Sequence, residues 1–182
     1  MSEKVSLYKT PPMSGSIKVI TYIIVALPIP LATFGFINHT PDLYKWSLFL
    51  ILLSAGVWLW MRPTQYELDG RALTIVWPLR KYVVHRSSIS RVRVLDRSEV
   101  KKELGSALRI GVGGLFGGFG LLWTRRQGLI RFYITRLDNF VMIDRCNGRS
   151  LLISVDDPRG MVKELGGENE GCSYSAACTG LL

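Results

Sequence analysis

Few residues of this sequence are of the kinds that hold metal ions. The chain of 182 residues has two histidines, His39 and His85, and three cysteines, which show no C-x-x-C spacing. Structural zinc sites need four such ligands at short, regular spacings. No grouping of a nucleophile with a general base stands out either. We therefore predict no metal ion, no cofactor and no enzyme activity.

The sequence also lacks the motifs that bind nucleotide phosphates, although residues 111–120 read GVGGLFGGFG. A Walker A loop needs a lysine and then serine or threonine after its last glycine, and Phe119 and Gly120 stand at those positions. A dinucleotide-binding motif needs glycine at its sixth position, which Phe116 and Trp123 occupy in the two frames. The glycines therefore need another explanation.

Three roles remain open for residues 111–120. Glycines within a strand permit bulges and close approach of neighbouring backbones, so we expect a bulged β-segment whose aromatic residues pack on the domain. A third membrane crossing and a shallow contact with the membrane interface are the alternatives. Residues 110–124 carry no charge but number only fifteen, fewer than a spanning helix needs.

Two stretches of the chain are almost free of charge. Residues 19–37 contain no charged residue, and residues 43–61 contain only Lys45 near their start. Each stretch approaches the ~20 residues that cross a bilayer as a helix. We expect residues 18–61 to form a two-helix transmembrane hairpin, kinked at Pro28 and Pro30. Two buried helices of a soluble protein are the alternative.

The connector between these stretches lacks basic residues. Residues 38–44 carry Asp42 and no lysine or arginine, whereas basic residues precede the first stretch and follow the second. Positively charged flanks stay in the cytoplasm. The sequence therefore predicts a multi-pass protein of the cell inner membrane or plasma membrane. Both termini are cytoplasmic in this interpretation, with residues 1–17 forming a cytoplasmic N-terminal segment.

The part of the chain that follows Met61 has the pattern of a β-domain. Asp69-Gly70 separates two β-rich runs, which is a strong hairpin signal. Residues 138–139 and 147–148 join later runs in the same way. About seven short strands are expected, which is typical of a small barrel or sandwich. The β-rich runs are residues 66–68, 72–77, 81–85, 89–95, 130–135, 140–145 and 150–155.

One helix is expected after the last strand. Asp157 is a suitable N-cap and Pro158 suits the first helical position, so a helix is predicted over residues 157–165. Its apolar residues should cover one end of the β-structure; they are Met161, Val162 and Leu165. Residues 166–182 are small and polar, and we expect a flexible tail there, in which Cys172 and Cys178 are candidate lipid acceptors.

Three blocks of sequence resemble the end of the bacterial PH-domain family: GGLFGGFGLLWTRRQG, IRFYITRLDNFVMI and SLLISVDDPRGMVKEL. The resemblance covers residues 66–165, and the last block is its most specific part. It implies a cytoplasmic PH-like barrel over residues 62–165, with about seven strands and one C-terminal capping helix behind the membrane hairpin. The family is known by fold better than by activity, so the resemblance assigns no catalytic or ligand residue.

Basic residues are concentrated in the predicted domain. Residues 62–165 contain 19 lysines and arginines against 10 aspartates and glutamates. Basic residues near an anionic membrane surface are attracted to it, although a general positive-inside bias gives the same composition. No nucleic-acid recognition motif accompanies the charge. The residues predicted to contact lipid or a partner are Arg80, Lys81, Lys101, Lys102, Phe116, Phe119, Trp123, Arg125 and Arg126.

Together these features predict a membrane-anchored binding or scaffolding module. It would contact anionic lipid headgroups or a membrane protein partner at the cytoplasmic face of the membrane. The alternative is an accessory subunit of a transporter or envelope enzyme that acts through its transmembrane hairpin. The two hypotheses differ in which part of the chain makes the functional contact.

Overall fold

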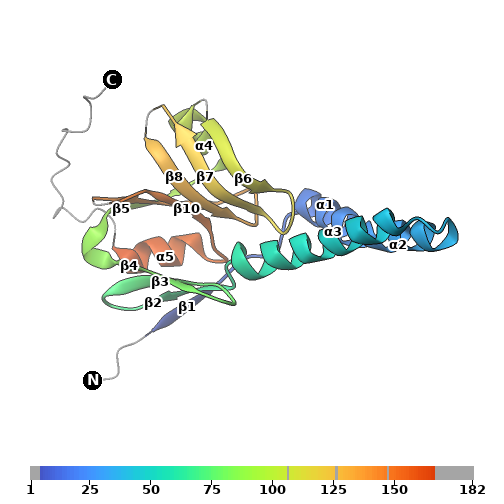
Figure 1. Ribbon diagram of the computed structural model, residues 1–182. Helices are drawn as coiled ribbons and strands as arrows, with labels where there is room; N and C mark the ends of the chain where they lie inside the picture. Colours follow the sequence, from blue (N-terminus) through green and yellow to red (C-terminus); the bar gives the residue numbers. More distant parts are fainter. Residues whose placement is uncertain (1–4, 106, 126, 147, 167–182) are drawn as a thin grey trace.

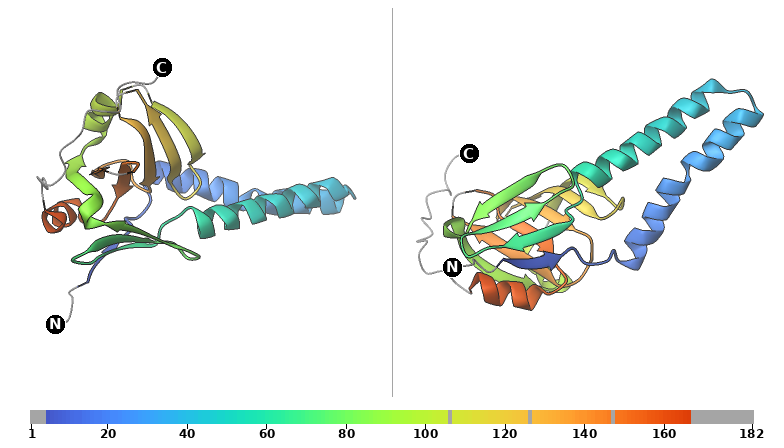
Figure 2. Two further views of the ribbon diagram at one scale, coloured as in Figure 1. Left: turned by 60° about the vertical axis from the view of Figure 1, so that its left-hand side comes forward. Right: turned by 90° about the horizontal axis from the view of Figure 1, so that it is seen from below.

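The computed structural model describes residues 5–105, 107–125, 127–146 and 148–166. A domain of two β-sheets carries a long helical hairpin that projects from one end (Figures 1 and 2). The predicted tail lies outside the described residues from residue 167 onward, and so do Arg126 and Asn147.

The first sheet has four antiparallel strands in the order β1-β2-β3-β4. The predicted hairpin at Asp69-Gly70 is confirmed, and the Gly70 N–H donates to Asp69 Oδ1 at 2.7 Å. Strand β1 was not predicted, because its pairing partner β2 lies beyond the whole hairpin in the sequence. The strands are β1 (Ser6–Lys9), β2 (Gln65–Leu68), β3 (Ala72–Val76) and β4 (Lys81–His85).

A short 3-10 helix, η1 (Arg86–Ser88), leads into the second sheet, whose order is β5-β9-β10-β8-β7-β6. Strand β10 lies antiparallel to β9, as predicted, but parallel to β8 on its other side. Residues 138–139 thus join β8 to β9 without pairing them. The strands are β5 (Ile89–Leu95), β6 (Ala107–Gly113), β7 (Gly118–Thr124), β8 (Gly128–Ile134), β9 (Phe140–Arg145) and β10 (Leu151–Ser154).

The predicted barrel of about seven strands needs correction. The described residues form ten strands in two sheets, and the sheets do not close into a barrel. Two features account for the difference: the N-terminal segment adds β1, and the glycine-rich stretch supplies paired strands. Helix α4 (Arg97–Leu104) is a further addition, and Asp96 and Glu99 form the capping box at its start.

Helix α5 (Pro158–Leu165) confirms the predicted C-terminal helix. Asp157 Oδ1 accepts a hydrogen bond from the Gly160 N–H at 2.9 Å, as expected of an N-cap. Met161 and Leu165 are fully buried in the main apolar core, and Val162 packs against it. The helix lies between the two sheets, at the end away from the helical hairpin (Figures 1 and 2).

A carboxylate on α5 holds β1 in place. Glu164 accepts hydrogen bonds from Ser6 Oγ at 2.5 Å and from the Tyr8 hydroxyl at 2.6 Å. Burial, together with the hydrogen bond to Glu164, raises the pKa of Tyr8 to about 12. The segment before the hairpin is therefore part of the β-domain's structure, and a domain cut at residue 62 would lack it.

The projecting hairpin consists of α1 (Gly15–Ala26), α2 (Pro28–Ile37) and α3 (Pro41–Trp60). The first arm is interrupted at Leu27, immediately before Pro28, and α2 continues through Pro30. Beside this interruption, Ser47 Oγ of α3 donates to the Pro28 carbonyl at 3.0 Å. Both arms, Gly15–Ile37 and Pro41–Trp60, are long and apolar enough to cross a membrane.

Candidate ligand-binding site

Helix α3 is attached to the four-stranded sheet at its final turn. The carbonyl of Met61, the residue after α3, accepts a hydrogen bond from Trp77 Nε1 at 3.1 Å. Trp77 is itself buried at the end of β3, and its ring meets Tyr133 edge-on with 5.2 Å between ring centroids. The end of α3 and the turn between β3 and β4 therefore form one packed unit.

Helix α1 is attached to the six-stranded sheet through the glycine-rich stretch. Thr21 Oγ1 donates to the Gly114 carbonyl at 3.1 Å and accepts from the Phe116 N–H at 2.9 Å. Thr21 is only 4% exposed. Because residues 111–120 form parts of β6 and β7 and the turn between them, they are a docking element for α1 and do not form a third membrane helix.

Backbone geometry explains the need for glycine at part of this stretch. Gly117 has φ 148°, and a Cβ atom there would lie 2.5 Å from the Ile134 carbonyl oxygen. A larger residue would be strained and would also collide with the neighbouring strand. Gly113 is different, because its φ is not in the positive region and the nearest atom to a Cβ would be Arg109 Nη1 at 3.5 Å. Of these two glycines, only Gly117 therefore has a positive φ.

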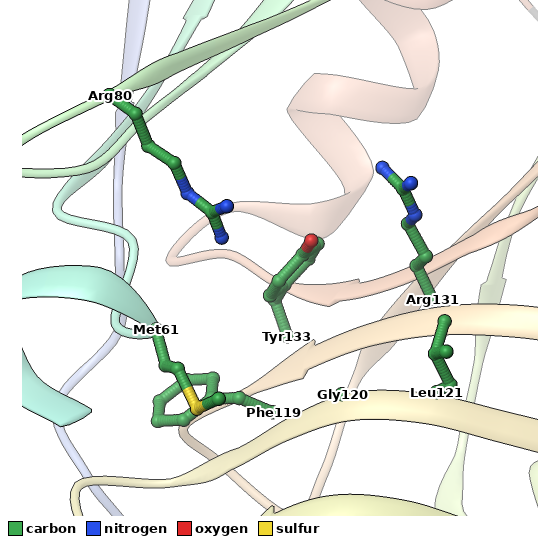
Figure 3. Close-up of a pocket in the computed structure, with 7 residues that line it drawn as sticks. All are labelled: Met61, Arg80, Phe119, Gly120, Leu121, Arg131 and Tyr133. Atoms are coloured by element: carbon green, nitrogen blue, oxygen red, sulfur yellow. The ribbon is translucent and has the colours of Figure 1, made fainter.

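A cavity of about 130 Å³ lies between the two sheets, beside the end of α3. Figure 3 shows its lining: Met61 and Arg80 come from the side of α3 and the four-stranded sheet, and the remaining residues come from β7 and β8. Those on β7 and β8 are Phe119, Gly120, Leu121, Arg131 and Tyr133. One part of the wall is therefore apolar and another part carries two guanidinium groups.

The two arginines of the cavity are held by aromatic rings. The Arg80 guanidinium lies 4.6 Å from the centre of the Trp77 ring, and that of Arg131 lies 5.1 Å from the centre of the Tyr82 ring. Within the described residues, neither guanidinium forms an ion pair with a carboxylate. Stacking fixes the direction of each cation and leaves its N–H groups free to bind an anion.

Two tyrosines accompany these cations. Burial raises the pKa of Tyr133, and the positive charges of Arg131 and Arg80 oppose this rise. In Figure 3 the Tyr133 hydroxyl lies between the two guanidinium groups. Tyr66 is fully buried nearby, and its hydroxyl has no hydrogen-bond partner among the described residues. Burial and the proximity of Tyr133 raise the pKa of Tyr66.

The structure places the predicted contact residues in several separate locations. Arg80 and Phe119 both line the cavity, and Phe119 belongs to the buried core. Phe116 stands at the turn that docks on α1, with φ 59°. These three residues therefore lie near the hairpin end of the domain.

The other predicted contact residues lie elsewhere on the domain. Lys81 is exposed at the start of β4, 3.8 Å from Glu67. Lys101 and Lys102 belong to the last turn of α4, away from the helical hairpin (Figures 1 and 2). Trp123 and Arg125 are exposed at the end of β7 opposite to the glycine-rich turn. Arg126 lies outside the described residues.

Sequence reasoning missed Arg131 and Tyr133, which share one face of β8. They alternate with the buried Phe132 in the run Ile130-Arg131-Phe132-Tyr133. An arginine at an inward-facing position of a strand is a usable signal, because charged residues are seldom turned towards a core without a partner or ligand. No sequence signal indicated that Arg131 and Arg80 line the same cavity, because 50 residues separate the two arginines in the sequence.

Comparison with known families agrees with this architecture. The family model described as "Bacterial PH domain" matches residues 64–169, which is more than half of the chain. The chain belongs to the bacterial PH-domain family. No curated protein and no solved structure matches it.

PH domains are generally binding modules without catalytic activity. Asp157, one of two adjacent carboxylates, caps α5. Within the part of the chain that the structure describes, no three histidine, cysteine, aspartate or glutamate side chains come together as a metal site.

Proposed function

We propose that this protein is a membrane-anchored PH module that binds anionic lipid or a protein partner at the cytoplasmic face of the membrane. One observation supports the proposal that the hairpin anchors the protein in the membrane. Strand β1 precedes the first apolar arm, β2 follows the second, and the two strands pair along their length, from Ser6 opposite Leu68 to Lys9 opposite Gln65. Both ends of the hairpin therefore start from the same sheet, as two crossings require.

The hairpin's surface supports its placement in lipid. Its large apolar side chains point outward, and Ile29, Phe36 and Ile37 are each at least 67% exposed. Its buried positions include Thr21, Ser47 and Ser54. Membrane helices commonly pack through small and polar residues and present large apolar ones to lipid. Water would make this arrangement costly, because each exposed large side chain forgoes roughly 1.5–3 kcal/mol of burial.

Charge supports the cytoplasmic placement of the PH domain. The connector at the tip of the hairpin, residues 38–40, has no lysine or arginine, whereas residues 62–165 carry 19 of them. The first arm begins three residues before Lys18, and Arg62 lies two residues after the end of the second arm. The positive-inside rule then leaves the tip outside and the domain inside.

Cysteine labelling in intact cells tests the topology. In a variant whose native cysteines are replaced by serine, Thr40→Cys at the hairpin tip should react with a membrane-impermeant maleimide. Ser98→Cys, which is exposed on α4, should react only after permeabilisation. Labelling of Ser98→Cys from outside would contradict the proposed orientation. Protection of Thr40→Cys before and after permeabilisation would contradict a two-crossing hairpin.

Hydrogen exchange tests the contact with lipid. We expect the full-length protein in nanodiscs to show slower exchange at residues 77–82 when phosphatidylglycerol replaces part of the phosphatidylcholine, because this turn adjoins the end of α3 and carries Arg80. Helix α4, at the far end of the domain, is the internal control. Equal exchange in both lipids would leave a protein partner as the ligand of the PH domain.

A further inference from the structure

The cavity beside α3 lies at the level of lipid headgroups if the hairpin crosses the membrane as proposed; the inference below rests on that proposal. Met61, in the cavity wall, directly follows Trp60, which is 58% exposed at the end of α3. Exposed tryptophans at the end of a spanning helix mark the boundary between hydrocarbon and headgroups. Leu79, next to Arg80 on the adjoining turn, is 61% exposed. An exposed leucine and a cationic neighbour suit the same boundary.

The two arginine side chains of the cavity are positioned to bind a phosphate group. Arg80 lies on the turn between β3 and β4, and Arg131 lies on β8 of the other sheet. Their guanidinium groups lie over the rings of Trp77 and Tyr82 and bind no carboxylate among the described residues. The guanidinium group matches phosphate in shape and can donate two parallel hydrogen bonds. The Tyr133 hydroxyl, which has no described hydrogen-bond partner, lies between them in Figure 3 as a further donor.

The rest of the cavity is apolar, and this favours one source of phosphate over another. Met61, Phe119 and Leu121 form the apolar part of the wall. A free phosphate ion gains nothing from these side chains, whereas the glycerol and first acyl carbons of a phospholipid can pack on them. The cavity of about 130 Å³ has room for a group of several non-hydrogen atoms.

We propose that this cavity binds the phosphate-bearing headgroup of an anionic phospholipid, with Arg80 and Arg131 as the phosphate ligands. Arg80 is on a turn of the four-stranded sheet and Arg131 is on a strand of the six-stranded sheet, and each sheet is attached to a different arm of the hairpin. Thr21 attaches α1 to the six-stranded sheet, and Met61 attaches α3 to the four-stranded sheet. A headgroup bound by both arginines would bridge the two sheets at the membrane surface.

Lipid titration of the full-length protein in mild detergent tests the site. The probes are short-chain phosphatidylglycerol, short-chain phosphatidylcholine, glycerol 3-phosphate and inorganic phosphate, followed by native mass spectrometry and by the shift in melting temperature. We expect phosphatidylglycerol to bind and stabilise the protein more than any other probe. Removing either cation, by Arg80→Gln or Arg131→Gln, should weaken its binding about tenfold, as loss of one charged hydrogen-bonding partner does.

A matched pair of variants separates the site from general attraction to charge. Lys101→Gln with Lys102→Gln removes the same charge as Arg80→Gln with Arg131→Gln, but on α4, away from the hairpin. The α4 variant should bind phosphatidylglycerol like the wild type. Equal weakening in both double variants would overturn the proposal. Arg80 is exposed on a turn, so the single Arg80→Gln variant keeps the test valid if the Arg131 variant does not fold.

The apolar wall gives a second readout. Leu121→Ser should weaken binding of phosphatidylglycerol and leave any binding of glycerol 3-phosphate unchanged. Tighter binding of free phosphate or glycerol 3-phosphate than of the lipid would overturn the lipid assignment. If the wild-type protein does not bind the lipid, although the Thr40→Cys variant is labelled from outside, this site alone is overturned. Failure of that labelling would instead overturn the proposed membrane topology.

Discussion

In the PH domain the large apolar side chains lie inside, whereas in the helical hairpin they lie outside. Phe132 in the domain is 1% exposed and Phe36 in the hairpin is 72% exposed. Small polar side chains are buried in both regions, for example Thr21 and Ser47 in the hairpin and Thr135 and Ser154 in the domain. The same hydrophobic effect gives both results if the domain is surrounded by water and the hairpin by lipid. The difference is the one expected of a chain whose domain lies in water and whose hairpin lies in lipid.

Close packing in the two regions also has different origins. In the hairpin, small residues let the backbones approach, and a Cβ atom on Gly35 would lie 3.0 Å from Leu43 Cβ. In the domain, the core is filled by branched and aromatic side chains from both sheets and α5. Thr21 connects the two regions, because its hydroxyl sits on a hairpin helix and binds the backbone of a domain turn.

Matched phenylalanine substitutions give the largest expected contrast between the two regions. Phe132→Ala should lower the free energy of unfolding of the PH domain by about 3–5 kcal/mol, because it leaves a cavity in a closed core. Phe36→Ala should change it by less than about 0.5 kcal/mol, because the ring packs little within the protein. Denaturant unfolding in detergent, followed by near-ultraviolet circular dichroism, measures both. Equal losses would show that the hairpin is packed like the domain.

Glycine substitutions should separate two positions of the glycine-rich stretch. Gly117→Val should destabilise the domain by about 1–3 kcal/mol from backbone strain alone, since its φ is positive and the Ile134 carbonyl blocks a side chain. Gly113→Val meets neither obstacle and should cost much less. The same unfolding measurement compares them. A larger loss for Gly113→Val than for Gly117→Val would contradict the strand geometry described here.

Removing one hydroxyl should loosen the connection between the two regions. Thr21→Val keeps the shape of the side chain but leaves the Gly114 carbonyl and the Phe116 N–H without their partner, which costs about 1–3 kcal/mol. Hydrogen exchange at Phe116 should accelerate accordingly. Thr33→Val is the control, because Thr33 bonds only to its own helix at Ile29. Unchanged exchange in Thr21→Val would show that the turn is held by other contacts.

The smallest of the expected effects is that of alkaline pH on the attachment of β1. The pKa of Tyr8 rises from 10.0 to about 12 on folding, so the folded chain keeps a proton that the unfolded chain loses between these values. Stability from this group is therefore fully present below pH 10 and is lost as the pH rises towards 12. Melting temperatures from pH 9 to 12 should fall less steeply in Tyr8→Phe than in the wild type. Identical slopes would exclude this contribution.

Local signals account for the elements that were predicted correctly. Asp69-Gly70 fixes a tight turn, and Asp157 with Pro158 starts α5, because caps and turns depend on residues within one or two turns of the chain. Helix α4 had such a signal as well, since Asp96 and Glu99 have the spacing of a capping box. The sequence alone was sufficient to predict this helix, although we did not predict it.

The candidate site could be predicted only in part. Arg80 and Phe119 were identified from charge and aromatic content, but their meeting with Arg131 and Tyr133 depends on how the two sheets face each other. The parallel pairing of β10 with β8 likewise places strands together that no turn connects. Such pairings have no local sequence signature, because their energy comes from burial after the chain has closed a long loop.

The sequence by itself determined where the chain is apolar for the length of a membrane helix, where its turns fall and where its last helix begins. These properties follow from composition and from short-range backbone chemistry. The tertiary structure alone decided that β1 joins β2 across the hairpin, that the glycine-rich turn binds Thr21 and that Arg80 and Arg131 share a cavity. Each of these contacts joins residues at least 50 positions apart, which only the packing of the whole chain brings together.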